Sequence, residues 1–244
     1  NPNQLVLLNS RVLAEAWDDA LGILDHYHNH NPQFTLGGLP YVDMRPSVPT
    51  LVRDIHDGAL RIERIVNDLK DFARPGGSGT QAVFHLNETV ERALRLLGHL
   101  IRKRTARFKV DLASNLPPLR GDAQQTEQVV VNLVVNALEA LPDRDKGVTV
   151  STAYDAKTRC EILEVRDEGI GIAREHLARL CDPFFTTKQA TGGTGLGLAI
   201  TASLVRAHGA RLDFDSELGK GTQAVVSFPD LEDDAAMLNT AAGS

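Results

Sequence analysis

The sequence predicts an α+β protein in which an N-terminal antiparallel helical hairpin is followed by a two-layer α/β sandwich. Two observations lead to this fold class. Residues 1–75 show only the three-and-four spacing of apolar residues that is typical of helices, whereas strand-like and helical patterns alternate from residue 82 onward. A stretch rich in proline, glycine and serine separates the two parts.

The composition sets the broad class of the protein. With 244 residues, 42% hydrophobic content and a net charge of −6, the chain can bury a sizeable core, and its acidic balance disfavours binding to nucleic acid. No apolar run reaches the roughly 20 residues that a membrane-spanning helix needs. We therefore expect a cytoplasmic chain, either free or as the cytoplasmic part of a membrane-bound sensor whose sensor domain lies upstream.

Two helices are expected before residue 76. In each, apolar residues recur at intervals of three and four, with charged residues between them. The connection over residues 29–49 is rich in Asn, Pro and Gly. Because two apolar seams are poorly buried within one hairpin, we expect two copies to form a four-helix bundle. The seams consist of Leu13, Trp17, Ala20, Leu24 and Tyr27 in the first helix, and of Val48, Val52, Ile55, Ala59, Ile62, Val66, Leu69 and Ala73 in the second.

The segment Pro75-Gly-Gly-Ser-Gly79 can neither continue a helix nor hold a strand. We therefore predict that the hairpin covers residues 1–75, a hinge covers 76–81 and the α/β domain covers 82–230. Residues 231–244 are small and acidic, so we expect a disordered tail.

The α/β domain is expected to contain six strands and three long helices. Asn87 is the expected N-cap of its first helix, and Gly209 is the expected C-cap of its last. The strands are expected at 82–86, 107–112, 148–153, 161–166, 211–215 and 224–228, and the helices at 88–101, 123–141 and 195–208.

The helix expected over 123–141 carries a polar stripe on an otherwise apolar surface. Gln128, Asn132 and Asn136 are spaced by four residues and therefore share one face. Carboxamide oxygens there suit a hard cation such as Mg²⁺, which also binds substrate phosphates. The alternative is that they are structural residues with hydrogen-bonded side chains. The apolar stripe consists of Val130, Val134, Ala137, Leu138 and Leu141.

The segment Asp167-Glu-Gly-Ile-Gly171 follows an expected strand. A carboxylate at this place can accept a hydrogen bond from the exocyclic amine of adenine, whereas guanine presents an oxygen there and would be repelled. The two glycines allow the chain to turn sharply beside the base. A plain surface turn is the alternative, because Asp-x-Gly sequences often form one.

Three further segments carry polar or glycine-rich patterns. The run from Gly192 to Leu198 has four glycines directly before a helical pattern, so its backbone N–H groups can approach a polyphosphate, although such runs also occur in linkers and dinucleotide sites. In the segment 182–188, Phe184 and Phe185 are expected to anchor a mobile lid on the domain. The third segment, Gly219-Lys-Gly-Thr222, would in isolation be a hairpin turn.

Taken together, these segments resemble the ATP-binding domain of the GHKL superfamily (gyrase, Hsp90, histidine kinase, MutL), and specifically that of the sensor histidine kinases of two-component systems. The run from Ile62 to Pro75 likewise resembles the second helix of their dimerisation and phosphoacceptor hairpin. The motifs occur in the family's order: the N-box Asn132-Leu-Val-Val-Asn136-Ala, the G1 box Asp167-Glu-Gly-Ile-Gly171, the F-box from Asp182 to Lys188, the G2 box Gly193-Thr-Gly-Leu-Gly197-Leu, and Gly219-Lys-Gly-Thr222.

The resemblance implies that the chain binds ATP and Mg²⁺ and transfers the γ-phosphoryl group to a histidine. It assigns Asn136 to Mg²⁺ and Asp167 to adenine, and it assigns the G2 backbone, with Thr194 and Lys188, to the phosphates. Asn132 and Lys188 are the implied catalytic residues. The implied ATP-binding set is Asn132, Asn136, Asp167, Gly169, Gly171, Ile172, Thr187, Lys188, Gly193, Thr194, Gly195, Leu196, Gly197, Leu198 and Thr222.

One position separates the branches of this superfamily. Its hydrolytic members and serine kinases carry a glutamate four residues before the metal-binding asparagine, where it serves as a general base. The residue here is Asn132, whose amide cannot accept a proton. A neutral imidazole is already a nucleophile, so Asn132 favours transfer to histidine over hydrolysis. A GHKL-type ATPase and a nucleotide-sensing scaffold that transfers nothing are the alternatives.

The phosphoacceptor histidine is expected upstream of the printed sequence. In the family it belongs to a motif of the form His-Glu-x-Asn-Asn-Pro, and the opening Asn1-Pro2-Asn3 resembles the tail of that motif. The acceptor would then lie four residues before Asn1. His56, followed by Asp57, is rejected because no room for a further helix remains before the ATP-binding domain. The implied partners are a second copy of the chain, bound through the hairpin, and the receiver domain of a response regulator.

Overall fold

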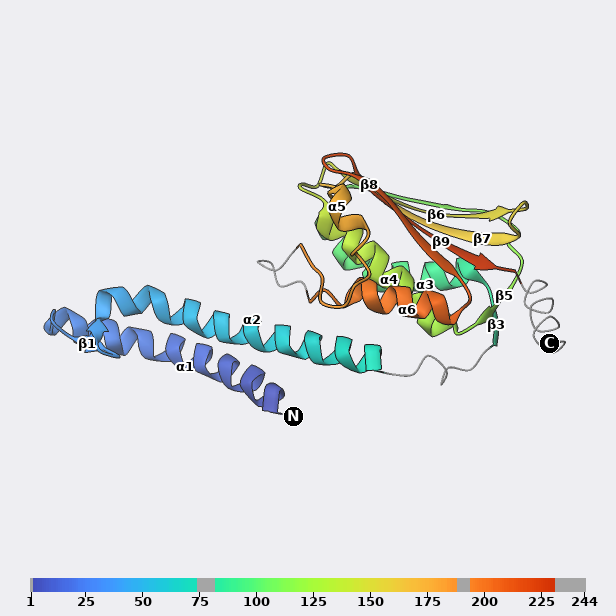
Figure 1. Ribbon diagram of the computed structural model, residues 1–244. Coiled ribbons are helices and arrows are strands. Elements are labelled where there is room, and N and C mark those ends of the chain that lie inside the picture. The colour runs from blue at the N-terminus through green and yellow to red at the C-terminus, as the bar shows by residue number, and fades with distance from the viewer. Residues whose placement is uncertain (1, 74–81, 188–193, 231–244) are drawn as a thin grey trace. The chain divides into compact units, whose positions relative to one another are not determined.

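The structure is a computed structural model that describes residues 2–73, 82–187 and 194–230. The chain divides into two compact units, Asn1–Lys70 and Asp71–Ser244 (Figure 1). The hinge predicted over 76–81 and the disordered tail predicted over 231–244 lie outside the described residues, so both stay predictions. Within the described part of the chain, no helix is both long and apolar enough to cross a membrane.

The first unit is a helical hairpin, as predicted. Helix α1 spans Pro2–His30 and helix α2 spans Tyr41–Ala73. The two helices are antiparallel, because residues early in α1 contact residues late in α2. The Asn3 side chain donates to the carbonyl oxygen of Ala59 at 2.8 Å, and the hydroxyl of Ser10 lies 2.9 Å from Nδ1 of His56.

The connected ends of the two helices are joined by a polar cluster. The Asp25 carboxylate accepts hydrogen bonds from the Tyr41 hydroxyl at 2.6 Å and from the Arg45 guanidinium at 2.8 and 2.9 Å. These bonds, that of Arg45 above all, lower the pKa of Asp25 to about 2. The cluster fixes where α2 starts relative to α1.

The connection between the helices is shorter than predicted. It spans residues 31–40 rather than 29–49, and it contains the short antiparallel pair of β1 (Thr35–Leu36) and β2 (Leu39–Pro40). The prediction failed because Pro46 and Pro49 were read as part of the loop, whereas both lie inside α2. The fixed φ of proline is compatible with a helix. Each proline removes one backbone hydrogen bond from the helix and strains it locally. Both prolines lie on exposed turns, where water can hydrate the released carbonyls.

The apolar stripe of α2 is wider than its contact with α1. Ala59 is buried, and Val48 and Val52 are half-buried. A second row of apolar residues along α2 is exposed to solvent in the single chain, and we call this row the exposed seam. It consists of Leu51, Ile55, Ile62, Val66 and Leu69, whose exposed fractions range from 40% to 53%.

The second unit is a two-layer sandwich, also as predicted. A five-stranded sheet in the order β4-β6-β7-β9-β8 is covered on one face by helices α3, α4 and α6 (Figure 1). Strands β4 and β6 are parallel, and all other neighbours in this sheet are antiparallel. The bounds are Arg107–Leu112 for β4, Gly147–Asp155 for β6, Cys160–Asp167 for β7, Arg211–Glu217 for β8, Gly221–Pro229 for β9, Leu86–Arg104 for α3, Ala123–Ala140 for α4 and Gly197–Ala207 for α6.

Two short elements had no clear pattern in the sequence. Strand β5 (Leu119–Gly121) pairs antiparallel with β3 (Ala82–Phe84), and helix α5 (Arg174–Leu177) has a single turn. Segments of three or four residues are too short to express a period, so tertiary contacts decide them. The core between sheet and helices follows the predicted stripe of α4, because Val130, Val134 and Leu138 are fully buried.

The predicted N-cap of α3 is wrong. The helix begins at Leu86 with His85 as its N-cap residue, so Asn87 lies inside the first turn. The Asn87 side chain donates to the carbonyl oxygen of Ala113 at 2.8 Å and accepts from the Thr152 hydroxyl at 2.7 Å. An asparagine next to a strand is typical of a cap. Here it instead joins the helix to β6 and to the loop after β4.

The C-cap residue of α6 is His208, so the predicted C-cap, Gly209, is wrong by one residue. Gly209 is the residue that follows the cap. Its φ of +65° lies in the left-handed region that favours glycine. The N–H of Gly209 donates to the carbonyl of Arg206, and the N–H of Ala210 donates to that of Val205, both at 3.0 Å. These two bonds form a Schellman motif, which satisfies the last carbonyls of the helix.

Candidate functional site

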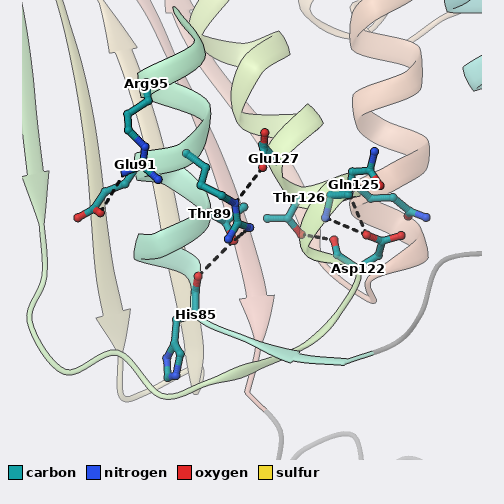
Figure 2. A network of polar contacts seen from close by, with 10 residues as sticks. His85, Thr89, Glu91, Arg95, Asp122, Gln125, Thr126 and Glu127 are labelled. Carbon is teal, nitrogen blue, oxygen red and sulfur yellow. Dashed lines mark hydrogen bonds and ion pairs between the residues drawn. The ribbon is translucent and has the colours of Figure 1, made fainter. Parts of the chain in front are cut away.

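Helix α4 runs the length of the candidate site and is fixed at its start. The Asp122 carboxylate caps it by accepting from the backbone N–H groups of Gln124 at 2.8 Å and Gln125 at 3.2 Å (Figure 2). Glu127 also joins α4 to α3, because it accepts from the Arg92 guanidinium at 3.1 Å. The predicted polar stripe is half-buried, in contrast to the fully buried apolar stripe.

One end of the site is built around Asp167, the last residue of β7. The Asp167 side chain is only 6% exposed. Its Oδ1 accepts from the backbone N–H of Gly169 at 2.8 Å and from that of Thr222, on the neighbouring strand β9, at 3.2 Å. Two donors on one oxygen fix the plane of the carboxylate. The carboxylate can therefore act as an oriented hydrogen-bond acceptor.

At two glycines around Asp167, the backbone packs too closely on its neighbours to admit a side chain. A Cβ on Gly171 would overlap the carbonyl oxygen of Glu217, and a Cβ on Gly221 would overlap that of Asp167. The φ angles of these two glycines are +67° and +96°. Ile170 donates to the carbonyl of Ala140 at 3.0 Å, which places the turn beside the C-terminal end of α4.

Ser216 on β8 is a site residue that the sequence analysis missed. Its hydroxyl accepts from the backbone N–H of Ile172 at 2.9 Å and donates to the carbonyl of Gly221 at 2.9 Å. It also lies 3.0 Å from the hydroxyl of Thr222. Ser216 therefore joins the turn of Asp167 to the loop of Thr222. A lone serine in a strand carries no motif, so nothing in the sequence distinguished it.

The other end of the site is the start of α6. Leu196, its N-cap residue, is fully buried and donates its backbone N–H to the Thr194 hydroxyl at 3.3 Å. Gly195 has a φ of +69°, and a Cβ there would overlap the backbone of Phe184. The Phe184 N–H donates to the carbonyl of Gly195 at 3.0 Å. The loop before α6 thus packs backbone against backbone on the segment that contains the two phenylalanines.

Only one of the two phenylalanines packs on the domain as predicted. The ring of Phe185 lies 5.5 Å from that of His176, and the Arg179 guanidinium lies 4.6 Å from its centre. Phe184, in contrast, is 63% exposed and has a φ of +67°, which is uncommon for a bulky residue. The expectation that both rings anchor a lid is therefore wrong for Phe184, whose backbone makes the contact.

Three residues of the predicted phosphate-binding segments have no described position. Lys188 and Gly193, together with Gly192, lie outside the described residues. Thr187 is exposed at the border of that segment. The implied roles of Thr187 and Lys188 in binding ATP stay predictions.

The two asparagines of α4 lie between these two ends. Asn132 reaches the first turn of α6, because its Nδ2 donates to the Thr201 hydroxyl at 3.2 Å and to the Gly197 carbonyl at 3.4 Å. Asn136 is half-buried one turn further along α4, and Ala140, beside the Asp167 turn, is one more turn on. At a rise of 1.5 Å per residue, the step from residue 132 to residue 140 is about 12 Å. One face of α4 therefore connects the two ends.

This donor set fits a nucleotide with a hard cation. A buried, oriented carboxylate is placed at one end, a glycine-rich helix start at the other, and carboxamide side chains lie between them. The NH₂ group of Asn132 is engaged by two acceptors, so its oxygen faces away from α6. An amide oxygen is a suitable ligand for Mg²⁺.

Comparison with known proteins gives one family match. Residues 121–232 match the family described as histidine kinase-, DNA gyrase B- and HSP90-like ATPase. These residues include the asparagines of α4, the Asp167 turn, the start of α6 and Thr222.

Curated relatives extend the similarity beyond this domain. The chain is 33% identical over 228 residues to a protein of Shewanella frigidimarina that is named as a sensor. This match covers 93% of this chain and 34% of that protein. It is 31% identical to sporulation kinase E of Bacillus subtilis, over 69% of this chain and 22% of the relative. It is also 32% identical to the sensor histidine kinase ZraS of Escherichia coli, and this match covers 69% of this chain and 35% of ZraS. The chain thus spans about a fifth to a third of the length of these relatives.

Two solved structures have a similar fold. Full-length ShkA in complex with AMPPNP matches with a TM-score of 0.64 at 21% identity, over 93% of this chain and 45% of that one. The catalytic domain of histidine kinase ThkA matches with a TM-score of 0.55 at 26% identity, over 62% of this chain and 95% of that one.

Proposed function

We infer that this chain, whose residues 121–232 belong to the histidine kinase-, DNA gyrase B- and HSP90-like ATPase family, is the catalytic core of a sensor histidine kinase. It would bind ATP and transfer the γ-phosphoryl group to a histidine side chain, from which a response-regulator aspartate would receive it. The similarity to named sensor kinases supports this reading.

One observation carries the proposal: the buried Asp167 carboxylate, held by two backbone N–H groups at the end of β7. A fixed acceptor on a residue that is 6% exposed recognises the exocyclic amine of adenine and disfavours guanine, whose oxygen would face it. We assign Gly169, Gly171, Ile172 and Thr222 to the same end, as residues that shape the site around the base.

The opposite end would hold the phosphates. We assign this role to the backbone of residues 193–198 together with Thr194, Thr187 and Lys188. Backbone N–H groups at a helix start favour anions. Asn136, and Asn132 beside it, would contact the Mg²⁺ that accompanies the nucleotide, and that ion would neutralise charge on the phosphates.

The side chain of Asn132 favours phosphoryl transfer over hydrolysis. A water molecule needs a general base to become an effective nucleophile, and a carboxamide cannot accept a proton at neutral pH. The amide nitrogen of Asn132 is also engaged with α6. A neutral imidazole needs no such base, because its free nitrogen already carries a lone pair. A histidine is therefore the acceptor that this site can serve.

The hairpin would form the dimer. The exposed seam of α2 is a continuous apolar stripe along a long helix, and two such stripes pack together in a four-helix bundle. A symmetric second copy is thus the expected partner, and the receiver domain of a response regulator is the second.

Incubation of the full-length protein with γ-labelled ATP and Mg²⁺ tests this function. We expect a phosphoprotein that is stable to alkali and labile to acid, as phosphohistidine is, and we expect the Asp167→Asn variant to form much less of it. An acid-stable product would contradict the proposal. Steady release of phosphate without any phosphoprotein would instead identify an ATPase.

A further inference from the structure

Thr201 lies on α6, one turn after Gly197, and no sequence motif distinguishes it. Its side chain is fully buried. The hydroxyl donates to the carbonyl oxygen of Gly197 at 2.8 Å, and its oxygen lies 3.2 Å from Nδ2 of Asn132. Thr201 therefore contacts the asparagine of α4 that lies nearest to the helix start.

The Thr201 hydroxyl has one proton, and the carbonyl of Gly197 takes it. Toward Asn132 the hydroxyl can consequently only accept. The Gly197 carbonyl, 3.4 Å from the same nitrogen, can also only accept. Two acceptors on one side of the amide require the NH₂ group there, and the oxygen must then lie on the other side.

We propose that Thr201 is a positioning residue that fixes the Asn132 side chain in the orientation that presents its oxygen, rather than its NH₂ group, to the magnesium ion of bound ATP. This inference rests on the proposed function, because it assumes that the site holds magnesium and a nucleotide. A flipped amide would place its oxygen against the carbonyl of Gly197 and would turn two hydrogen-bond donors toward a cation. Both changes are unfavourable.

The Thr201→Val variant tests the proposal, because valine has nearly the same shape and lacks the hydroxyl. The measurement is the dissociation constant of ATP, by calorimetric titration, in Mg²⁺ and in EDTA. In Mg²⁺ we expect the variant to bind ATP about tenfold more weakly. Loss of a residue that orients a metal ligand typically weakens metal binding by about 10- to 100-fold, and we expect the lower end of that range. In EDTA we expect no change. The Thr201→Ser variant keeps the hydroxyl and should bind as the unmodified protein does.

Two outcomes would overturn the proposal. Equal weakening in Mg²⁺ and in EDTA would mean that Thr201 only supports the fold of α6, and unchanged affinity in both would mean that it does not position Asn132. If Thr201→Val does not fold, which thermal unfolding reports, Thr201→Ala removes the same hydroxyl without adding a methyl group. If the unmodified protein does not bind ATP, the proposed function itself is refuted. This outcome is distinguishable from failure of the proposal, in which the unmodified protein binds ATP and only the behaviour of the variant differs from the expectation.

A second readout needs no ligand. In the ligand-free protein, the side-chain NH₂ signals of Asn132 in a ¹⁵N NMR spectrum should exchange slowly with solvent, because both protons are engaged. The Asn132→Asp variant, which lacks these signals, identifies them. We expect faster exchange in Thr201→Val and the original rate in Thr201→Ser. An unchanged rate in Thr201→Val would show that the hydroxyl does not hold the amide.

Discussion

At the scale of single residues, the Asp167 carboxylate supports the local structure and, in the proposed function, also recognises the base. Its Oδ1 holds the turn of Gly169 and the loop of Thr222, so removal of the whole side chain would disturb both. Substitution by asparagine keeps one oxygen for these two bonds and replaces the other oxygen with an NH₂ group, which cannot accept a hydrogen bond from the base. The substitution thus separates recognition of the base from support of the turn.

We expect Asp167→Asn to weaken ATP binding by roughly 5- to 150-fold with little change in thermal stability. This range corresponds to the loss of one partner of a buried hydrogen bond, about 1 to 3 kcal/mol. The measurement is the dissociation constant of ATP. Asp111→Asn, on the exposed surface of β4, is the matched control and should bind ATP normally. Equal affinity in both variants would refute the role of Asp167.

Glu161 is a second notable residue and has no part in the candidate site. It lies on β7 between Tyr154 of β6 and Phe228 of β9, is fully buried, and neither of its carboxylate oxygens has a hydrogen-bond partner among the described residues. Burial, together with the nearby charge of Asp230, raises the pKa of Glu161 from 4.5 to about 7. The folded protein therefore holds this proton more tightly than the unfolded chain does.

The sign of the pH effect follows from that raised pKa. The contribution of Glu161 to stability is fully present below about pH 4.5 and is lost as the pH rises through about 7. Glu161→Gln cannot ionise, so we expect a higher unfolding temperature than that of the unmodified protein at pH 8 and a similar one at pH 5. Thermal unfolding across this range is the measurement, with Glu164→Gln as the control. Parallel curves for Glu161→Gln and the unmodified protein would contradict the prediction.

At the scale of elements, α6 is joined to α4 near both of its ends. Asn132 bonds the first turn of α6. At the other end, Nε2 of His208 accepts from the backbone N–H of Asp122 at 3.0 Å, while its Nδ1 lies 2.8 Å from the carbonyl of Leu204. In these contacts Nε2 is the acceptor, and Nδ1 lies within hydrogen-bond distance of a backbone carbonyl. The two helices thus form one unit, and the loop before α6 leads directly into it.

We expect His208→Ala to destabilise the protein by about 1 to 3 kcal/mol, because the buried N–H of Asp122 would lose its acceptor. Denaturant unfolding is the measurement. The control is His99→Ala, an exposed histidine on α3, which we expect to be nearly neutral. If both variants unfold at the same denaturant concentration, the contact at this end of α6 does not support the unit.

At the scale of the whole molecule, the exposed seam of α2 is the feature that a single copy leaves unsatisfied. Half-exposed branched side chains over five turns of a helix are unfavourable in water, and a second copy would cover them. This geometry supports an isologous dimer, in which the same stripe contacts its own symmetry mate.

We expect the chain to be dimeric in light scattering and Ile55→Asp to shift it toward the monomer, because a buried carboxylate without a partner is costly in an apolar seam. Asp54→Asn, which changes an exposed neighbour without adding charge, serves as the control and should stay dimeric. A dimer that persists in Ile55→Asp would place the interface elsewhere.

The sequence predicted those parts of the fold that a period or a motif encodes. The stripe of Val130, Val134 and Leu138 identified the buried face of α4, and the glycine at 209 marked the end of α6. Asn87 was misread because the same residue type serves as a cap or as a bridge between elements, and only its neighbours decide which. Pro46 and Pro49 were misread because a helix tolerates an internal proline where the residue is exposed and water can hydrate the carbonyl that loses its hydrogen bond.

The sequence by itself determined which residue types stand where: an aspartate at a strand end, asparagines on one helical face, and glycines at backbone contacts that admit no side chain. It could not determine the partners of those residues. Thr222 lies 55 positions after Asp167, and Thr201 lies 69 after Asn132, so no local pattern connects them. Hydrogen bonds act over about 3 Å in space, whatever the separation along the chain. Only the pairing of β7 with β9 and the packing of α6 on α4 bring these partners together, and the orientation of the Asn132 amide follows from the second of these contacts.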